Sequence, residues 1–192
     1  MIMEIKDVFL EMPILETKKT ILRKMNAEDA KDMFEYSSNR EVTKYLSYDH
    51  TSIEDAEKYI RNKEEKYAKG ECMIWGIEYK ENKKYIGACG FTHWDTENNS
   101  AEIAYSLNQD YWGKGIMSEI VNNLFEFGFE KMNLNRIEAR CWSNNDKSVR
   151  IMEKNNMRFE GVLRDQIFVK GKYRDVKMYS ILKWEYVKEY FF

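Results

Sequence analysis

The spacing of apolar and polar residues changes several times along this chain of 192 residues. Apolar positions three or four residues apart predict helices, and alternating or β-branched runs predict strands. The helical pattern occupies four segments, 26–37, 52–69, 115–132 and 145–156. The strand pattern occupies seven, 20–25, 72–80, 83–91, 101–107, 136–142, 158–169 and 173–183.

Several residues at the predicted boundaries fit these helices. Asn26 is a good N-cap and is followed by Asp29 three residues later. Thr51 or Ser52 can begin the second helix, and Gly70 is placed to end it. Residues 38–51 have no regular pattern, and we expect them to be irregular.

The order of the elements restricts the fold. Three consecutive strands over 72–107 predict antiparallel pairing, whereas the strand–helix–strand units at 101–142 and 136–169 require a parallel segment. We therefore predict a single α/β (α+β) domain with a mixed, mostly antiparallel sheet of about seven strands flanked by about four helices. We expect an N-terminal arm at 1–14, the domain at 15–184 and an aromatic C-terminal tail at 185–192.

Composition removes several functional classes. The 31 basic and 33 acidic residues give a net charge of −2, which does not favour nucleic-acid binding through phosphate contacts. No run of 18 apolar residues predicts a membrane span, and the N-terminus lacks the apolar region of a signal peptide. Three separated cysteines inside apolar runs predict a cytoplasmic protein with reduced, buried thiols. With two histidines and no CxxC, we expect no metal site.

The segment with the clearest chemistry runs from Gln109 to Ser118, between a strand and a helix. Gly113 and Gly115 let the backbone approach a ligand, and the N–H groups of the following helix start attract anions. Lys114 adds a positive charge. The Rossmann and Walker patterns both fail here, and taken alone this segment is equally well a tight strand-to-helix turn.

In context, the segment resembles motif A of the GNAT superfamily of acyl-CoA-dependent N-acetyltransferases. Gly115 falls at the family's glycine, while Trp112 replaces Gln or Arg and Met117 replaces a small residue. The sequence Tyr-Trp-Gly-Lys-Gly is more similar to the branch of ribosomal-protein N-terminal acetyltransferases. The resemblance extends over about 15–184, with further matching segments at Ile21-Leu22-Arg23, Ala101-Glu102-Ile103-Ala104-Tyr105, Asn135 to Arg140, Asn145-x-x-Ser148, Glu160 to Arg164 and Tyr179 to Leu182.

The resemblance implies an acyl-CoA N-acyltransferase domain that uses acetyl-CoA as co-substrate. Backbone N–H groups hold the pyrophosphate, and pantetheine pairs with a strand edge and with Asn145. The pyrophosphate residues are Gly113, Lys114, Gly115, Ile116, Met117 and Ser118, and the strand residues are Tyr105, Ser106 and Leu107. The strand pairing is expected where this strand separates from 136–142.

The resemblance also implies the catalytic groups. Glu102 is the leading general base, with His93 and Asp95 as alternatives. Many members carry an acidic Tyr where this chain has Met152, so Ser148, one turn earlier, is the predicted hydrogen-bond donor to the leaving thiolate. For each residue a structural role stays open. Glu102 is then a surface carboxylate, Ser148 a helix-surface or capping hydroxyl, and Asn145 a helix N-cap. Tyr179 and Trp94 are further candidates for lining the site, with packing favoured for both.

The predicted reaction is acetyl transfer to a primary amine by direct attack in a ternary complex. Similarity to the branch favours a protein N-terminus as acceptor. A small amine, such as a polyamine, an aminoglycoside or an amino acid, is the alternative, and a non-catalytic acyl-CoA sensor is a third possibility. The loops at 38–51 and 165–175 should choose the acceptor. The chain is expected to be a monomer or a homodimer, with its aromatic tail either docked on the domain or meeting a partner.

Overall fold

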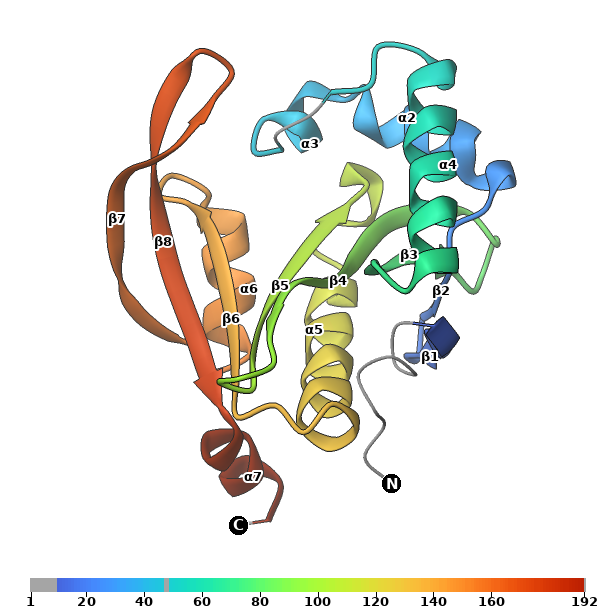
Figure 1. Cartoon of the computed structure of the whole chain (residues 1–192). Coiled ribbons are helices and arrows are strands. Elements are labelled where there is room, and N and C mark those ends of the chain that lie inside the picture. Colours follow the sequence, from blue (N-terminus) through green and yellow to red (C-terminus); the bar gives the residue numbers. More distant parts are fainter. Residues whose placement is uncertain (1–9, 47–48, 192) are drawn as a thin grey trace.

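The computed structural model describes residues 10–46 and 49–191, which form one eight-stranded sheet with helices on both faces (Figure 1). The strand order is β1-β2-β3-β4-β5-β6-β8-β7. All neighbouring pairs are antiparallel except β5 and β6, which confirms the predicted mixed sheet. The strands are β1 (Leu15–Glu16), β2 (Thr20–Arg23), β3 (Met73–Tyr79), β4 (Tyr85–Asp95), β5 (Ser100–Leu107), β6 (Arg136–Trp142), β7 (Arg158–Val169) and β8 (Lys172–Leu182).

The seven predicted strands are all present, and β1 is an additional short strand at the sheet edge. Two residues are too few for a period to be read, so the sequence pattern did not predict it. Over residues 12–46 and 49–191, the α-helices are α2 (Ala30–Ser37), α3 (Arg40–Thr43), α4 (Ile53–Lys69), α5 (Ile116–Glu126), α6 (Asp146–Lys154) and α7 (Lys183–Phe191). Short 3-10 turns lie at Ala27–Asp29 and Gln109–Tyr111.

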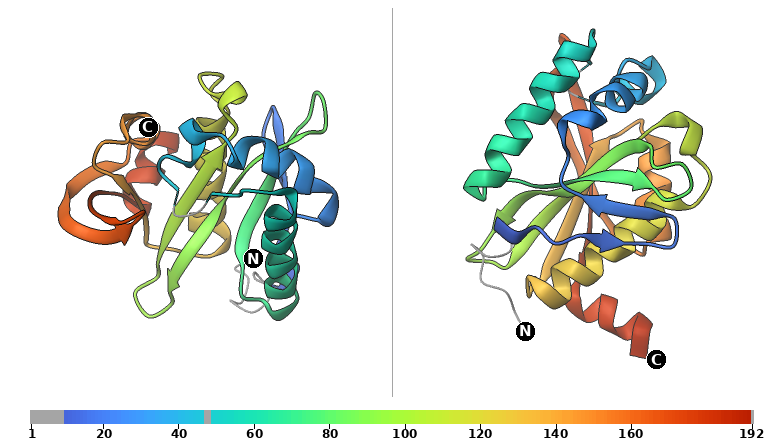
Figure 2. Two further views of the ribbon diagram at one scale, coloured as in Figure 1. Left: turned by 90° about the horizontal axis from the view of Figure 1, so that it is seen from above. Right: turned by 90° about the vertical axis from the view of Figure 1, so that its right-hand side faces the viewer.

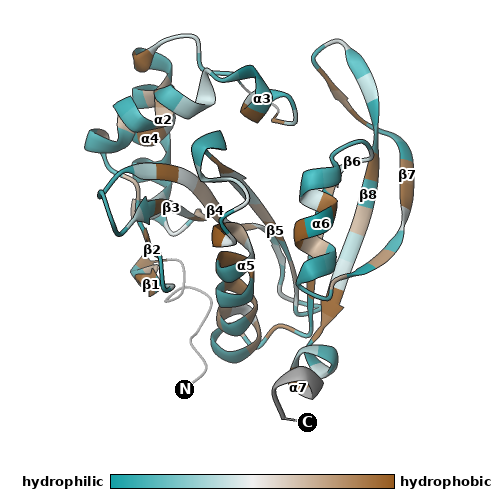
Figure 3. Ribbon diagram, turned by 180° about the vertical axis from the view of Figure 1, so that it is seen from behind, coloured by the Kyte–Doolittle hydropathy of each residue, from teal (hydrophilic) through white to brown (hydrophobic). Residues whose placement is uncertain are grey.

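The helices divide between the two faces of the sheet. Helices α5 and α6 cover one face, which we call the α5 face, and α4 with α2 covers the other, the α4 face (Figures 1 and 2). Seen from behind, α5 and α6 carry hydrophilic and hydrophobic bands side by side, as expected of helices that cover a sheet (Figure 3).

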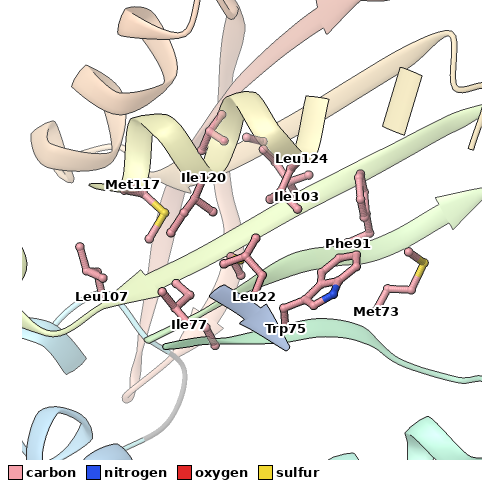
Figure 4. Packing of buried hydrophobic residues seen from close by; sticks show 14 of the residues in the cluster. Leu22, Met73, Trp75, Ile77, Phe91, Ile103, Leu107, Met117, Ile120 and Leu124 are labelled. Atoms are coloured by element: carbon pink, nitrogen blue, oxygen red, sulfur yellow. The ribbon is translucent and has the colours of Figure 1, made fainter. Parts of the chain in front are cut away.

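The core lies between α5 and the sheet (Figure 4). Trp75, Phe91 and Ile103 point from the strands toward Ile120 and Leu124 on α5, and all five side chains are buried. The three cysteines are buried and free, as the sequence predicts. Among the described residues, no helix is long and apolar enough to cross a membrane.

The predicted helix boundaries hold where capping residues mark them. The Asn26 side chain accepts a hydrogen bond from the Glu28 N–H, and Asp29 completes a capping box with Asn26. Ser52 caps α4, and Gly70 ends it in the left-handed conformation at φ 67°.

The helix expected over 115–132 is interrupted. After α5, residues Phe127–Lys131 form a wider π-type turn, in which the Met132 N–H donates to the Phe127 carbonyl at 3.1 Å. Gly128 lies in this turn against the side chains of Ile137 and Leu134, and a Cβ there would be 2.8 Å from Ile137 Cδ1. The turn therefore brings the backbone unusually close to the sheet, which a hydrophobic period does not indicate.

Two segments for which no helix was predicted contain helices. Residues 38–51 include α3, whose first turn is capped by the Asn39 side chain. The C-terminal segment forms α7, and Tyr186 packs on Phe129 at 5.1 Å between ring centres. This part of the aromatic tail is docked on the domain, while the division of the chain into arm, domain and tail stays a prediction.

Candidate functional site

The central feature of the sheet is a fork between its two parallel strands. Strands β5 and β6 pair from Ser100 and Arg136 as far as Ile103 and Ala139, and no further. Beyond that point β5 stays paired with β4, and β6 with β8. The facing edges of Ala104–Leu107 and Arg140–Trp142 are therefore available to a ligand inserted between them, which is where the sequence predicted a separation.

The loop that begins α5 lies at the open end of β5. Gly113 and Gly115 have φ of 73° and 76°, and a Cβ added at either residue would meet no atom within 4 Å. The N–H groups of residues 116–118 belong to the first turn of α5, where an α-helix offers no internal acceptor. Open space, free donors and a helix N-terminus together suit a phosphate group.

Three lysines surround this loop. The Lys114 ammonium lies 4.9 Å from the Tyr111 ring centre, and the Lys147 ammonium lies 3.7 Å from that of Trp112. The Lys19 ammonium donates to the carbonyl of Lys114 at 2.7 Å. Only Lys114 was predicted, because Lys19 and Lys147 reach the loop from distant parts of the sequence.

The side chains that follow the two glycines turn into the protein. Ile116 and Met117 are buried, and Met117 points toward the core from the first turn of α5 (Figure 4). The bulky residue at the family's small position is thus accommodated away from the loop surface. The Ser118 hydroxyl donates to Asn155 Oδ1 at 3.2 Å and ties α5 to α6.

On the α5 face of the fork, a tyrosine and a serine meet across the gap between the two strands. The Tyr105 hydroxyl is 3.0 Å from Ser148 Oγ. Burial raises the pKa of the Tyr105 phenol, and it raises the pKa of the nearby Cys141 thiol to about 11. Both groups are therefore protonated near neutral pH.

The sequence assigned Tyr105 only a backbone role and missed its hydroxyl. Helical spacing placed Ser148 on the face of Met152, but no pattern could reveal the strand residue that meets it. Asn145 acts as the N-cap of α6, and its side chain accepts from the Ser148 N–H at 3.2 Å. The predicted structural role of Asn145 is therefore present, and its side-chain amide is a second group that a ligand can use.

The α4 face of the fork carries a carboxylate and a guanidinium. Glu102 alternates with the core residue Ile103 and so points to the opposite face, where its Oε1 accepts from Arg140 Nε at 3.0 Å. Burial raises the pKa of Glu102, while Arg140 and His93 oppose that rise. Because Arg140 lies just beyond the last paired residue of β6, this ion pair spans the fork.

The alternative candidates have other contacts. His93 on β4 lies directly opposite Glu102 on β5, so its side chain is also on the α4 face. Asp95 accepts from the Asn98 side-chain amide at 2.7 Å and from the backbone N–H groups of Asn98 and Glu97, and these hydrogen bonds lower its pKa and organise the turn. Tyr179 is buried, and its hydroxyl donates to Glu153 at 3.3 Å, on α6. This favours the structural reading of Asp95 and Tyr179.

A cavity of about 450 Å³ lies beside Glu102, between α4 and the ends of β3 and β4. His93, Thr92 and Trp94 line it, together with Lys63 and Lys66. The Thr92 hydroxyl is 3.5 Å from Glu102 Oε1, so the cavity and the carboxylate are neighbours.

The two loops predicted to choose the acceptor approach each other above the fork. The Lys170 ammonium, in the β7–β8 turn, donates to the Thr43 carbonyl at 2.9 Å and to Asp49 at 2.7 Å. The Tyr45 hydroxyl donates to the carbonyl of Asn144 at 2.9 Å. These contacts join segments about 100 residues or more apart in sequence, which explains why the sequence indicated the loops but not their arrangement.

Comparison with known proteins agrees with this geometry. Residues 19–158 match the acetyltransferase (GNAT) domain family, and the chain belongs to that family. It is an N-acetyltransferase with the GNAT fold, as the sequence predicted. The N-acetyltransferase p20 of Bacillus licheniformis is 40% identical over 176 residues, which cover 91% of this chain and 99% of that protein.

Two further relatives have named acceptors. A ribosomal-protein-serine acetyltransferase of Escherichia coli is 28% identical over 129 residues, covering 67% of this chain and 71% of that protein. A spermidine N(1)-acetyltransferase of Vibrio cholerae is 29% identical over 105 residues, covering 55% and 61%.

Solved structures have the same fold. A GNAT-family acetyltransferase from Bacillus anthracis has a TM-score of 0.79 at 26% identity and covers 90% of this chain and 100% of its own. The microcin C7 self-immunity acetyltransferase MccE, solved with acetyl-CoA and AMP, has a TM-score of 0.77 at 23% identity and covers 86% and 93%.

Proposed function

We propose that this enzyme moves the acetyl group of acetyl-CoA to the α-amine of a protein N-terminus, by direct attack while both substrates are bound. The observation that carries the proposal is the fork, which separates two sets of polar groups. Tyr105, Ser148 and Cys141 lie on its α5 face, and Glu102 and Arg140 lie on its α4 face. A thioester held between the strands is then reached by an amine from the α4 face.

The binding of acetyl-CoA rests on the loop and the strand edge. Backbone N–H groups of 113–118 bind the pyrophosphate, with Lys114, Lys147 and Lys19 supplying positive charge. Pantetheine pairs with the unpaired edge of β5 at Tyr105, Ser106 and Leu107. The carbonyl of Leu107 already accepts from Trp112 Nε1 at 2.9 Å, so the first two residues of this edge are its main partners.

Glu102 is the proposed general base. An α-amine has an ordinary pKa of about 7.7–8.0, so roughly a tenth is neutral at pH 7 and a base needs to supply only modest help. Glu102 takes the proton that the amine loses on attack, through a water where the distance requires it. Arg140 is a positioning residue that holds the carboxylate at the fork.

Ser148 is the proposed hydrogen-bond donor to the departing sulfur, and Tyr105 positions its hydroxyl. A phenol with a raised pKa holds its proton more tightly than a thiol, whose pKa is about 8.5. The pair therefore stabilises the thiolate by hydrogen bonding. Glu102 releases the proton of the amine to solvent, and the thiolate takes up one proton from solvent, so the protons balance. In the overall reaction a C–N bond forms, the C–S bond breaks, and amide and thiol are the products.

A ribosomal-protein N-terminus is supported as acceptor by the similarity to the E. coli enzyme over two thirds of the chain. A polyamine is the second candidate, supported by the shorter match to the spermidine enzyme. The test is thiol release from acetyl-CoA with peptides that begin at ribosomal-protein N-termini and with spermidine. Faster turnover of spermidine than of every peptide would reverse this assignment. A cytoplasmic location and the oligomeric state stay predictions.

A further inference from the structure

The α4 face of the fork ends in a cluster of two aromatic rings and a cation. Trp142 is the last residue of β6, and the Arg174 guanidinium lies 5.0 Å from its ring centre. Tyr45 packs edge-on against the same tryptophan at 5.7 Å. We call these three residues the aromatic–arginine cluster. It is no part of the predicted acetyl-CoA site or of the predicted base and acid.

The cluster lies beside the path of the acceptor. Trp142 follows Arg140 by two residues on β6, so both side chains belong to the α4 face, about 7 Å apart along the strand. Arg140 holds the proposed base Glu102. A peptide whose terminal amine is at Glu102 therefore reaches the cluster with its second or third residue.

In the described part of the protein, Arg174 stacks on Trp142 but has no carboxylate partner. Its Nε is buried and has no hydrogen-bond partner, and no described carboxylate forms an ion pair with it. The neighbouring acids have other contacts, because Asp175 accepts from the Asp165 N–H and Asp49 pairs with Lys170. By contrast, the other arginine of the fork, Arg140, is matched by Glu102.

The surroundings hold this cation in place. Stacking on an aromatic ring orients the planar guanidinium, whose parallel N–H groups match a carboxylate or phosphate. The cluster is built from β6, β8 and the segment after α3. The Lys170–Thr43 hydrogen bond joins the end of α3 to the β7–β8 turn, and the Tyr45–Asn144 hydrogen bond joins the segment after α3 to the residues after β6. A cation ordered before binding loses little freedom when it meets an anion.

We infer that Arg174, stacked on Trp142, is a subsite for an anionic group of the acceptor, a carboxylate carried by the second or third residue of a peptide. This inference rests on the proposed function and narrows its substrate class. It favours acidic N-terminal peptides and disfavours polyamines, whose second and third amines would meet Arg174 as like charges.

The test compares three peptides that differ only at positions two and three, carrying Glu, Gln or Lys there. A charge-assisted hydrogen bond predicts a KM about tenfold lower for the Glu peptide than for the Gln peptide, with similar kcat. Arg174→Gln should remove that ratio, so that the Glu and Gln peptides have equal KM in this variant. Arg174→Lys should retain only part of the Glu-to-Gln ratio, because a lysine lacks the planar guanidinium.

Lys172→Gln is the matched control, since it removes an exposed cation from the same hairpin. It should leave the Glu-to-Gln ratio as in the wild type. An equal ratio in the wild type and Arg174→Gln would overturn the inference, and so would a wild-type preference for the Lys peptide.

A binding measurement separates this inference from the proposed function. The N-acetylated forms of the Glu and Gln peptides are titrated into the enzyme with CoA present, which requires no turnover. Tighter binding of the Glu form that is lost in Arg174→Gln supports the subsite even if no peptide is acetylated. Equal binding of the two forms contradicts it, even if the enzyme acetylates both peptides.

Discussion

At the scale of single residues, the two faces of the fork divide the chemistry. The sequence predicted Glu102 and Ser148 from their places in a resemblance, and both side chains lie at the fork. Their partners Arg140 and Tyr105 were missed as partners. The pairing of β5 with β6 brings Arg140 to Glu102, and the packing of α6 on the sheet brings Ser148 to Tyr105, and no local spacing encodes either contact. The residues could be predicted, but their protonation and contacts needed the fold.

Glu102→Gln should lower kcat/KM for an α-amine peptide by roughly tenfold at pH 7. Without the base only the amine that is already neutral reacts, and at pH 7 this is about a tenth of the total. The deficit should shrink as the pH rises past the pKa of the amine, and it should be larger for an ε-amine. A pH profile of initial rates measures this. Burial raises the pKa of Glu102 above 4.5. The wild-type rate should therefore fall as the pH is lowered through that raised pKa, because the protonated carboxyl cannot act as a base.

Glu138→Gln is the control for this prediction. It should keep the wild-type rate at neutral pH and move only the acid side of the profile to lower pH, because the charge of Glu138 contributes to the raised pKa of Glu102. Glu138 lies directly opposite Glu102 in the β5–β6 pairing and is bound by Arg136 instead. If Glu102→Gln and Glu138→Gln have equal profiles, or if Glu102→Gln turns over like the wild type across the whole pH range, Glu102 is not the base.

His50 should make stability depend on pH. It is buried, 2.7 Å from the Ser37 hydroxyl, and desolvation lowers its pKa from 6.5, although Asp55 and Asp49 oppose the shift. The His50 imidazole therefore binds a proton more readily in the unfolded chain than in the folded protein. Stability should be full above pH 6.5 and fall as the pH decreases through the lowered pKa of the folded state.

Urea unfolding of the wild type and of His50→Gln between pH 5 and 8 measures this dependence. The slope of unfolding free energy between pH 6.5 and 5 should decrease in His50→Gln. His93→Gln, which replaces an exposed histidine, should keep the wild-type slope. Identical slopes in all three proteins would contradict the account of His50.

At the scale of elements, the sequence predicted what local chemistry determines. Asn26, Ser52 and Gly70 mark helix ends because each satisfies backbone groups beside it in the chain. The two-residue β1 and the π-type turn at Gly128 depend on contacts with distant segments, and the pattern did not reveal them. The same holds for the loop at 113–118, whose glycines were evident while Lys19 and Lys147 were not.

Gly115→Ala should weaken acetyl-CoA binding more than it affects folding. A residue with a side chain at φ 76° costs about 1–2 kcal/mol in stability, and its Cβ would occupy the open space where the pyrophosphate is expected. Calorimetric titration should give a dissociation constant at least roughly tenfold higher, a loss of about 1.4 kcal/mol.

Gly171→Ala is a matched control, because Gly171 has φ 73° and equally open space but lies in the β7–β8 turn. Its thermal stability should fall by a similar amount, with acetyl-CoA affinity unchanged. Equal affinities in the Gly115 and Gly171 variants would show that the loop does not bind the cofactor.

At the scale of the whole molecule, the sheet brings the proposed cofactor loop at 113–118 and the proposed acceptor side, with Glu102 and Arg140, to one fork. The predicted fold class and the parallel segment within it follow from element order, and both are confirmed. The loops that meet above the fork are brought together by long-range contacts of Lys170 and Tyr45, which the sequence pattern does not reveal. The proposed acceptor class accordingly rests on the arrangement of the folded chain, since the net charge of −2 does not indicate Arg174.

The fork also constrains the order of chemical events. Cys141 is a potential nucleophile on the α5 face of the fork, but burial raises its pKa to about 11 and keeps it a thiol. An acetyl-enzyme is therefore not expected, and the amine should attack the thioester directly.

Initial rates of thiol release, measured while acetyl-CoA and a ribosomal-protein N-terminal peptide are both varied, test this claim most directly. The account predicts double-reciprocal lines that intersect, together with no thiol release when the peptide is absent. Parallel lines, with one equivalent of thiol released before the peptide is added and a mass increase of one acetyl group on the enzyme, would contradict it.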